Sequence, residues 1–189
     1  FLPADGSEST GNKTGDGSMT VIGGRGSGER EFQRPTSLEL VPSREHLVVA
    51  DRGNHRLQMA SVAQESMGEF VRYIGYAGSQ PSMHVRSLHW LRAPNDMAVD
   101  NDENLVVYDT SNKRLAVFTL EGECAYEVMK GFFRDSGNPY SNISCCRLTG
   151  RIAISDNDNH RIALVRPELH GGGVAGVHRW LPRVPRARG

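Results

Sequence analysis

The chain has 189 residues, and its 22 Lys and Arg residues balance 22 Asp and Glu residues, so the formal net charge is zero. This length is enough for one domain with a good core, whereas the balanced charge argues against nucleic-acid binding through an overall positive charge. No apolar run approaches the roughly 18 residues that a membrane-spanning helix needs. The three Cys residues, two of them adjacent, do not make a disulfide framework, and we expect a cytoplasmic location.

Residues 1–20 are predicted to be a flexible linker or disordered segment, because Gly, Ser, Thr and Asp dominate residues 5–20. The next stretch, Gly23 to Gly28, suggests a phosphate-binding loop, but its spacing fails. A third Gly is required at position 29, which is Glu29, and no helical pattern follows. A Gly-rich connection between structural units is the favoured interpretation.

One short phrase then occurs three times: an Asp, two variable residues, an Asn, a basic residue and an Arg. Each copy stands between two apolar runs, and the copies are 58 and 47 residues apart. The repeated positions are Asp51, Asn54 and Arg56, then Asp109, Asn112 and Arg114, then Asp156, Asn159 and Arg161. Self-similarity of this kind indicates an array of supersecondary units.

The first copy predicts a β-hairpin. The run from His46 to Asp51 is apolar and rich in β-branched residues, and the run from His55 to Ala60 alternates apolar with polar residues. Between them, Gly53 and Asn54 tolerate the positive φ that tight turns require. The carboxylate of Asp51 is expected to accept hydrogen bonds from turn amides and to pair with the guanidinium five residues later. The predicted role of the repeated triplet is therefore structural.

Two more strands complete each unit. A Pro precedes each motif by 15 to 17 residues (Pro35, Pro94 and Pro139), and a strand-like stretch follows it. After the first two hairpins a further short run ends in Gly75 and Gly131. Four short strands repeated at about 40 to 50 residues, without helical periodicity, predict the blades of an all-β propeller. The repeats are assigned to residues 21–60, 90–120 and 138–166 of a propeller segment spanning residues 21–170.

The first copy resembles the NHL repeat, whose pattern is Gly-x-Gly-x-Gly, Phe-x-x-Pro and then Val-x-Asp-x-x-Asn-His-Arg. The stretches Gly24 to Gly28, Phe32 to Pro35 and Val49 to Arg56 match that pattern, while the third copy has a degenerate start. The resemblance implies a six-bladed propeller. Such scaffolds occur in tripartite-motif and RING-type ubiquitin ligases, in translational repressors that bind RNA and in bacterial sensor ectodomains, and a peptide-amidating lyase has a related one. About three blades are visible, so we expect a fragment of a longer chain or a protomer that completes its ring with a second copy.

No catalytic residue, cofactor or metal site is predicted. The acidic stretches 100–103 and 156–159 begin like a calcium loop, but neither has the Gly and Glu that an EF-hand needs at positions six and twelve. The His residues lack zinc-site spacing, and no Gly-x-Ser-x-Gly sequence supports a nucleophilic Ser. Cys145 and Cys146 are expected on one strand, pointing to opposite faces and suited to small buried hydrophobic positions.

The connection from Gly75 to Pro94 is longer than the one from Gly23 to Pro35. Long loops on repeat scaffolds often form binding surfaces, and Trp90 in this connection is the best single anchor candidate for a partner. Packing between blades is the alternative role for this residue, because Trp is mostly buried on average.

We predict a non-enzymatic interaction scaffold that presents loops to a protein partner or to RNA, for example as the substrate-recruiting part of a ubiquitin ligase. For RNA, the resemblance implies contacts at the start of the inner strands, at Arg34, Thr36, Ser37, Arg92 and Asn95. The neighbouring Asp96 would repel a phosphate backbone, which favours a protein partner. The alternative is a propeller enzyme of the lyase or lactonase type with a channel metal. The Gly-, Pro- and Arg-rich tail at 171–189 is expected to be disordered, either as a solvated linker or as a basic arm.

Overall fold

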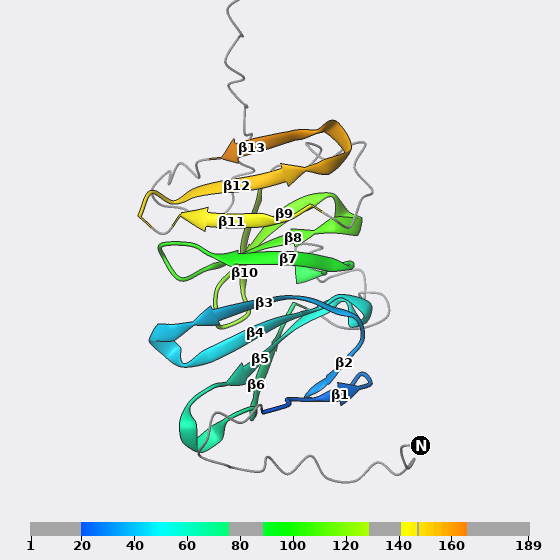
Figure 1. The fold of residues 1–189 in the computed structure, drawn as a ribbon, viewed down its shortest axis with the longest axis vertical. Coiled ribbons are helices and arrows are strands. Elements are labelled where there is room, and N and C mark those ends of the chain that lie inside the picture. The colour runs from blue at the N-terminus through cyan, green and yellow to red at the C-terminus, as the bar shows by residue number, and fades with distance from the viewer. Residues whose placement is uncertain (1–19, 76–88, 129–140, 147, 166–189) are drawn as a thin grey trace, which may run out of the picture.

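The computed structural model of the chain describes residues 20–75, 89–128, 141–146 and 148–165 (Figure 1). These residues form three antiparallel sheets stacked on one another, which confirms the predicted all-β fold built of propeller-type blades. The linker expected at 1–20 lies almost entirely outside the described residues, as do the tail at 171–189 and most of the connection between Gly75 and Pro94.

Each sheet is a meander in which consecutive strands are neighbours. The first blade contains β3 (Pro35–Val41), β4 (His46–Asp51), β5 (Arg56–Ser61) and β6 (Phe70–Ile74). The second contains β7 (Pro94–Val99), β8 (Leu105–Asp109), β9 (Arg114–Phe118) and β10 (Cys124–Val128). In the third, the described residues form β11 (Ile143–Cys146), β12 (Arg151–Asp156) and β13 (Arg161–Val165). Before the first blade, β1 (Gly24–Arg25) and β2 (Glu31–Phe32) pair in parallel.

The three motifs form hairpin turns of one design. A strand ends at the motif Asp, a single 3₁₀ turn follows (Arg52–Asn54, Thr110–Asn112 or Asn157–Asn159), and the next strand begins at the motif Arg. The residue with positive φ is the basic one before the Arg, at +58° in His55, +53° in Lys113 and +51° in His160. The expectation that Gly53 and Asn54 would adopt positive φ is therefore wrong.

Gly53 is required for a different reason, which is close packing. Its backbone N donates to the carbonyl O of Gln33 at 2.7 Å, and a Cβ on Gly53 would lie 2.5 Å from that same oxygen. The turn therefore needs a residue without a side chain because another backbone segment crosses directly over it.

The hydrophobic core lies between the blades, in two clusters. One cluster joins the first and second blades and includes Leu57, Ile74, Met97 and Phe118, and the other joins the second and third blades. The strand β8 is buried along its whole length because the second blade is covered on both faces. The outward faces of the flanking blades remain open, and Leu38 is 63% exposed on the first blade. Among the described residues, no helix is both long and apolar enough to cross a membrane.

Polar contacts also connect the inner strands β3, β7 and β11. Ser37 Oγ donates to Asp96 Oδ1 at 2.5 Å, and the backbone N of Ile143 donates to Asp96 Oδ2 at 2.7 Å. Asn95 Nδ2 donates to the carbonyl O of Ser141 at 3.3 Å. A single carboxylate thus joins all three blades, and the ends of the inner strands are fixed relative to one another.

Candidate functional site: the motif edge

The three motif turns lie at the same edge of the blades, on the right-hand side of Figure 1. Each of the first two turns stands beside the start of its inner strand, because Pro35 pairs with Asp51 and Pro94 pairs with Asp109. We call this region the motif edge. It consists of the three 3₁₀ turns, the segments 22–34 and 89–93, and the starts of β3 and β7.

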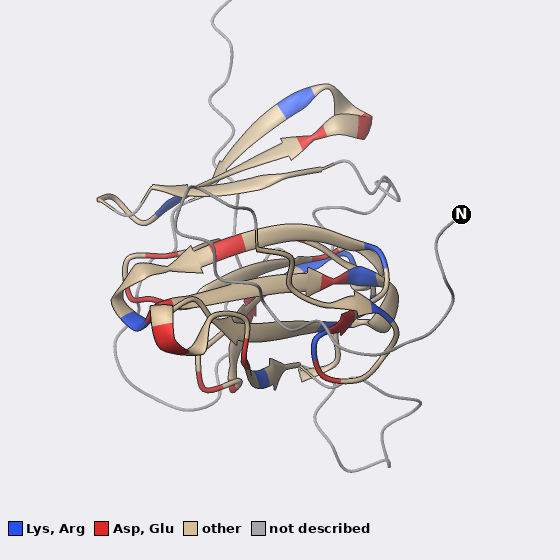
Figure 2. Ribbon diagram, turned by 60° about the horizontal axis from the view of Figure 1, so that its bottom comes forward, with Lys and Arg blue, Asp and Glu red and all other residues tan. Residues whose placement is uncertain are grey.

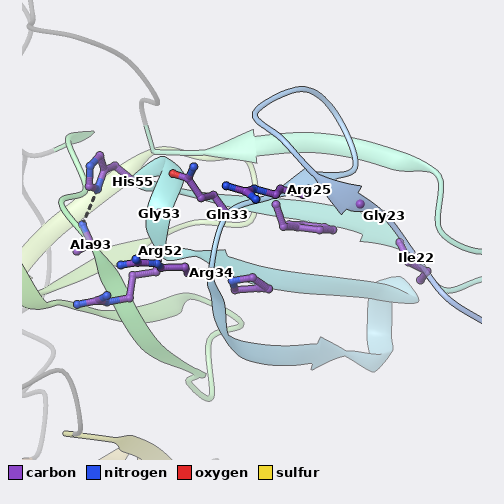
Figure 3. Close-up of a pocket in the computed structure, with 12 residues that line it drawn as sticks. Ile22, Gly23, Arg25, Gln33, Arg34, Arg52, Gly53, His55 and Ala93 are labelled. Atoms are coloured by element: carbon purple, nitrogen blue, oxygen red, sulfur yellow. Dashed lines mark hydrogen bonds between the residues drawn. The ribbon is translucent and has the colours of Figure 1, made fainter. Parts of the chain in front are cut away.

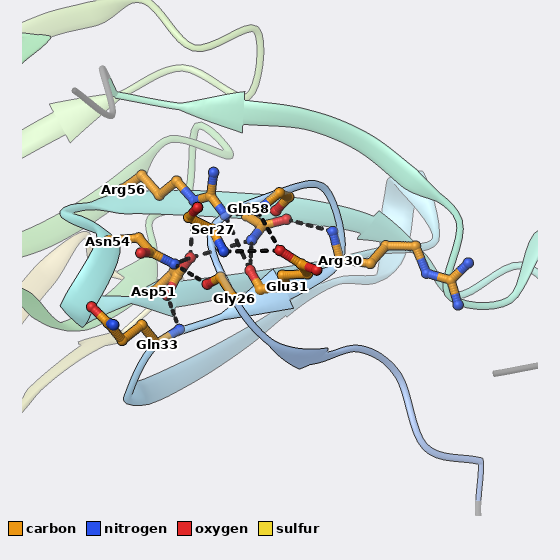
Figure 4. Close-up of polar contacts among 10 residues, drawn as sticks. Gly26, Ser27, Arg30, Glu31, Gln33, Asp51, Asn54, Arg56 and Gln58 are labelled. Atoms are coloured by element: carbon orange, nitrogen blue, oxygen red, sulfur yellow. Dashed lines mark hydrogen bonds and ion pairs between the residues drawn. The ribbon is translucent and has the colours of Figure 1, made fainter. Parts of the chain in front are cut away.

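The carboxylate of Asp51 ties the first turn to the segment that precedes β3 (Figure 4). This residue is fully buried, and its Oδ1 accepts a hydrogen bond from the backbone N of Gln33 at 2.7 Å. Its Oδ2 accepts from Asn54 Nδ2 at 2.8 Å, Arg56 Nε at 2.9 Å and Gln58 Nε2 at 3.2 Å. Four donors converge on one ionised group, which explains why an acidic residue stands at this position.

Arg56 extends the same network to the Gly-rich segment. Its Nη2 donates to the carbonyl oxygens of Gly28 at 2.7 Å and Glu31 at 3.0 Å, and its guanidinium lies 4.4 Å from the centre of the Tyr73 ring. The ion pair expected from the sequence is present. The backbone N–H that donates to Asp51, however, is that of Gln33 in the preceding segment and not one of the turn itself.

The second motif repeats this arrangement. Asp109 accepts from the backbone N of Arg92 at 2.7 Å, from Asn112 Nδ2 at 2.7 Å and from Arg114 Nε at 2.9 Å. Burial raises the pKa of Asp109, while these three hydrogen bonds act in the opposite direction. Arg114 also pairs with Glu127 at 2.9 Å, so this buried cation is held between two carboxylates.

The third motif is the most open one. Asp156 accepts from Asn159 at 2.9 Å and from Arg161 at 2.7 Å, and Figure 2 shows the acidic and basic segments facing each other across this hairpin. The Arg161 side chain is 50% exposed, against 4% for Arg56 and for Arg114. Water can therefore replace part of the ion pair in this copy alone.

Several residues predicted at the inner-strand starts take part in contacts between blades. Thr36 Oγ1 donates to the carbonyl O of Pro94 at 3.4 Å, Ser37 bonds Asp96, and Asn95 is buried. Both oxygens of Asp96 accept hydrogen bonds from protein donors, which holds this carboxylate in place between the blades.

Arg34, Arg92 and Trp90 occupy different positions at the motif edge. Arg34 and Arg92 are exposed, and both lie in the short segments that precede an inner strand. Trp90 is half-buried, and its carbonyl O accepts hydrogen bonds from Asn112 at 3.0 Å and Arg114 at 2.7 Å. The backbone of Trp90 is thus part of the second motif network.

A pocket of about 830 Å³ opens at the motif edge beside the first turn (Figure 3). Its wall includes Arg25, Arg34 and Arg52, together with His55, whose Nδ1 accepts a hydrogen bond from the backbone N of Ala93 at 3.0 Å. In Figure 3 the side chains of Arg34 and Arg52 extend in the same direction, while Arg25 extends toward Gln33 from the strand next to Gly23. Apolar parts of the wall come from Ile22, Phe32, Pro35 and Ala93.

The arginines of this pocket differ from the motif arginines in having no partner. Within the described part of the chain, the side chains of Arg25, Arg34 and Arg52 form no ion pair or hydrogen bond. The wall contains no acidic residue. Sequence reasoning identified Arg34 but missed Arg25 and Arg52, which stand at variable positions of the Gly-rich stretch and of the motif.

The described residues contain no group of three or more His, Cys, Asp or Glu side chains that could hold a metal ion. The acidic stretch 100–103 forms a hairpin turn, in which Asp100 Oδ1 accepts from the backbone N of Asp102 and of Asn104. Cys145 is half-buried and Cys146 is exposed, so the expectation of a buried position is wrong for Cys146.

A family model for the NHL repeat matches residues 32–58, which include the first motif and the segment that crosses over its turn. A search of curated proteins finds no match to the chain.

Proposed function

We propose that this chain, which belongs to the NHL-repeat family, is a protein-interaction scaffold whose motif edge binds an acidic segment of a partner protein. The finer possibilities are a role in recruiting substrates to a ubiquitin ligase and contact with RNA. The observation that carries the proposal is the group of three arginines without partners around the pocket beside the first turn.

The charge of the motif edge differs from that of the whole chain. Its motif carboxylates, Asp51, Asp109 and Asp156, are buried and paired with arginines, so they contribute little negative potential at the surface. Arg34 and Arg92 are exposed at the same edge. At the first blade, the pocket wall thus combines Arg25, Arg34 and Arg52 with no acidic residue, and a cationic surface of this kind favours acidic partners.

The motif networks also hold this surface in one conformation. The backbone of Gln33, next to Arg34, is bonded to Asp51 on one side and to Gly53 on the other. The backbone of Arg92 is bonded in the same way to Asp109 and to Ser111. Binding to a surface whose backbone is already ordered costs less conformational entropy than binding to a free loop.

Fluorescence anisotropy tests the proposal with three labelled probes: a Glu- and Asp-rich peptide, a neutral peptide of the same length and a single-stranded RNA. The acidic peptide is expected to bind, and the double variant Arg25→Ala/Arg34→Ala should weaken it by about tenfold, since each exposed charge pair is worth up to about 1 kcal/mol.

The matched control is Arg151→Ala. This exposed arginine begins β12, at the opposite edge of the third blade, and its replacement should leave peptide binding unchanged. Equal binding of the acidic and neutral peptides contradicts the proposal. Tight binding of RNA alone, falling steeply with salt, would assign the motif edge to nucleic acid instead.

A further inference from the structure

We infer that the pocket beside the first turn binds a phosphoryl group on a peptide segment of the partner, with Arg52 as its central donor. This inference rests on the proposed function and specifies the chemistry of the anchoring group. It draws on the unsatisfied nitrogen of Arg52, on the charge of the pocket wall and on the apolar surface beside it.

Arg52 holds a donor that the protein leaves without an acceptor. Its Nε is shielded from solvent, and no acceptor for it lies among the described residues. Shielding a charged donor without a hydrogen bond is unfavourable. An anion can accept from this nitrogen once the Arg52 side chain turns it toward the pocket, and that bond removes a cost already present in the free protein. The backbone carbonyl of Arg52 accepts from His55, which fixes the start of the side chain.

The charge of the wall fits a dianion better than a single carboxylate. Three arginines and no acidic residue line the space, and guanidinium forks match phosphate oxygens in pairs. Because His55 Nδ1 accepts from Ala93, the proton of its neutral ring stands on Nε2, which adds a further N–H donor at the pocket. Clusters of arginines of this kind are the general solution for recognising phosphorylated side chains.

The remainder of the wall favours a peptide over RNA. A volume of about 830 Å³ is much larger than one phosphoryl group, and Ile22, Pro35 and Ala93 offer apolar contacts to neighbouring residues of a peptide. Single-stranded RNA relies on aromatic rings for base stacking. The wall has one Phe, Tyr or Trp ring, that of Phe32, which lies so close to Gly23 that a Cβ there would overlap it, and the His55 imidazole is bonded to the backbone N of Ala93.

The test uses three peptide libraries that share randomised flanks and differ only at the central residue, which is phosphoserine, Glu or Ser. The wild-type chain is expected to prefer the phosphoserine library to the Glu library by about tenfold. Inorganic phosphate should compete. Arg52→Ala should abolish the preference, and Arg52→Lys, which retains the charge but loses Nε and the planar fork, should abolish most of it.

The matched control is Arg30→Lys. Arg30 also has a shielded Nε without a partner among the described residues, but it does not line the pocket, so this variant should behave like the wild type. Urea unfolding of every variant checks that the fold is retained.

Equal binding of the phosphoserine and Glu libraries overturns this inference and leaves the proposed function intact. No binding of any library, with the wild-type chain folded, overturns both. RNA that competes better than phosphate, with undiminished binding by Arg52→Lys, also overturns the inference.

Discussion

Replacing Asp51 by Ala is expected to lower the free energy of unfolding by about 3–5 kcal/mol, the cost of breaking a buried ion pair from one side. Asp51 is fully buried, and the Arg56 side chain with which it pairs is only 4% exposed. The substitution leaves this guanidinium without its carboxylate, and it removes the acceptor for the backbone N of Gln33. Water has little access to the Arg56 side chain, so the lost carboxylate is not replaced by solvent.

The third motif supplies an internal comparison. Asp156→Ala removes the same carboxylate, but the Arg161 side chain is 50% exposed and can be solvated. The expected loss is about 1–2 kcal/mol, the cost of two ordinary hydrogen bonds with a partly exposed ion pair. The difference between the two substitutions thus depends on burial and not on the identity of the motif.

Urea unfolding followed by far-UV circular dichroism measures both variants, and hydrogen exchange of the β4 and β5 amides reports on the first blade alone. The double variant Asp51→Ala/Arg56→Met should recover part of the loss, since it removes the stranded charge. If Asp156→Ala proves as costly as Asp51→Ala, or if Asp51→Ala costs less than about 1 kcal/mol, then burial does not set the strength of these networks.

Three further predictions concern other parts of the fold. Gly53→Ala should lower the free energy of unfolding in urea by about 1–3 kcal/mol, because the new Cβ meets a backbone oxygen at 2.5 Å. Gly24→Ala, with nothing within 4 Å, should change it by less than about 0.5 kcal/mol, and equal effects would contradict the close crossing of a second segment over Gly53. Alkylation followed by mass spectrometry should show modification of Cys146 before Cys124, because Cys146 is exposed and hydrogen bonds lower its pKa. Burial raises the pKa of Cys124 to about 11, which leaves about 0.1% thiolate at pH 8, and faster reaction of Cys124 would refute this order. Asp96→Ala should lower the free energy of unfolding in urea by about 2 kcal/mol, because it removes two hydrogen bonds between blades. Asp96→Asn should lower it less because one oxygen remains, and an unchanged stability of both variants would show that the inner strands do not depend on Asp96.

The repeated phrase was enough to predict the blades, because each hairpin is specified locally. The strand ends at an Asp, the return strand begins at an Arg, and the two residues pair across the turn in every copy. The pattern did not identify the residue with positive φ. The usual preference for Gly and Asn at such positions is overridden because Asn54 uses its side chain to bind Asp51, and Gly53 is needed where Gln33 crosses.

The candidate site was less predictable, because it depends on segments distant in sequence. The pocket brings together Arg25, from a Gly-rich stretch, and Arg52, from the motif turn. From the sequence alone, neither arginine can be distinguished from one that is simply exposed to solvent. The bonding of Asp96 to both neighbouring blades also depends on the sheet stacking, which the sequence pattern does not reveal.

The motif contains two kinds of position: some hold the turn together, and others set the charge of its surface. The Asp, Asn and Arg of each copy are engaged with one another, so they set the turn and are the same in all three blades. The two variable residues between Asp and Asn carry different charges: positive in the first blade through Arg52, neutral in the second, and negative in the third through Asp158. One scaffold can thus present a different charge at each blade without altering the network that holds the turn. The cationic pocket is consequently a property of the first blade, and a ligand that depends on it must bind at that end of the motif edge.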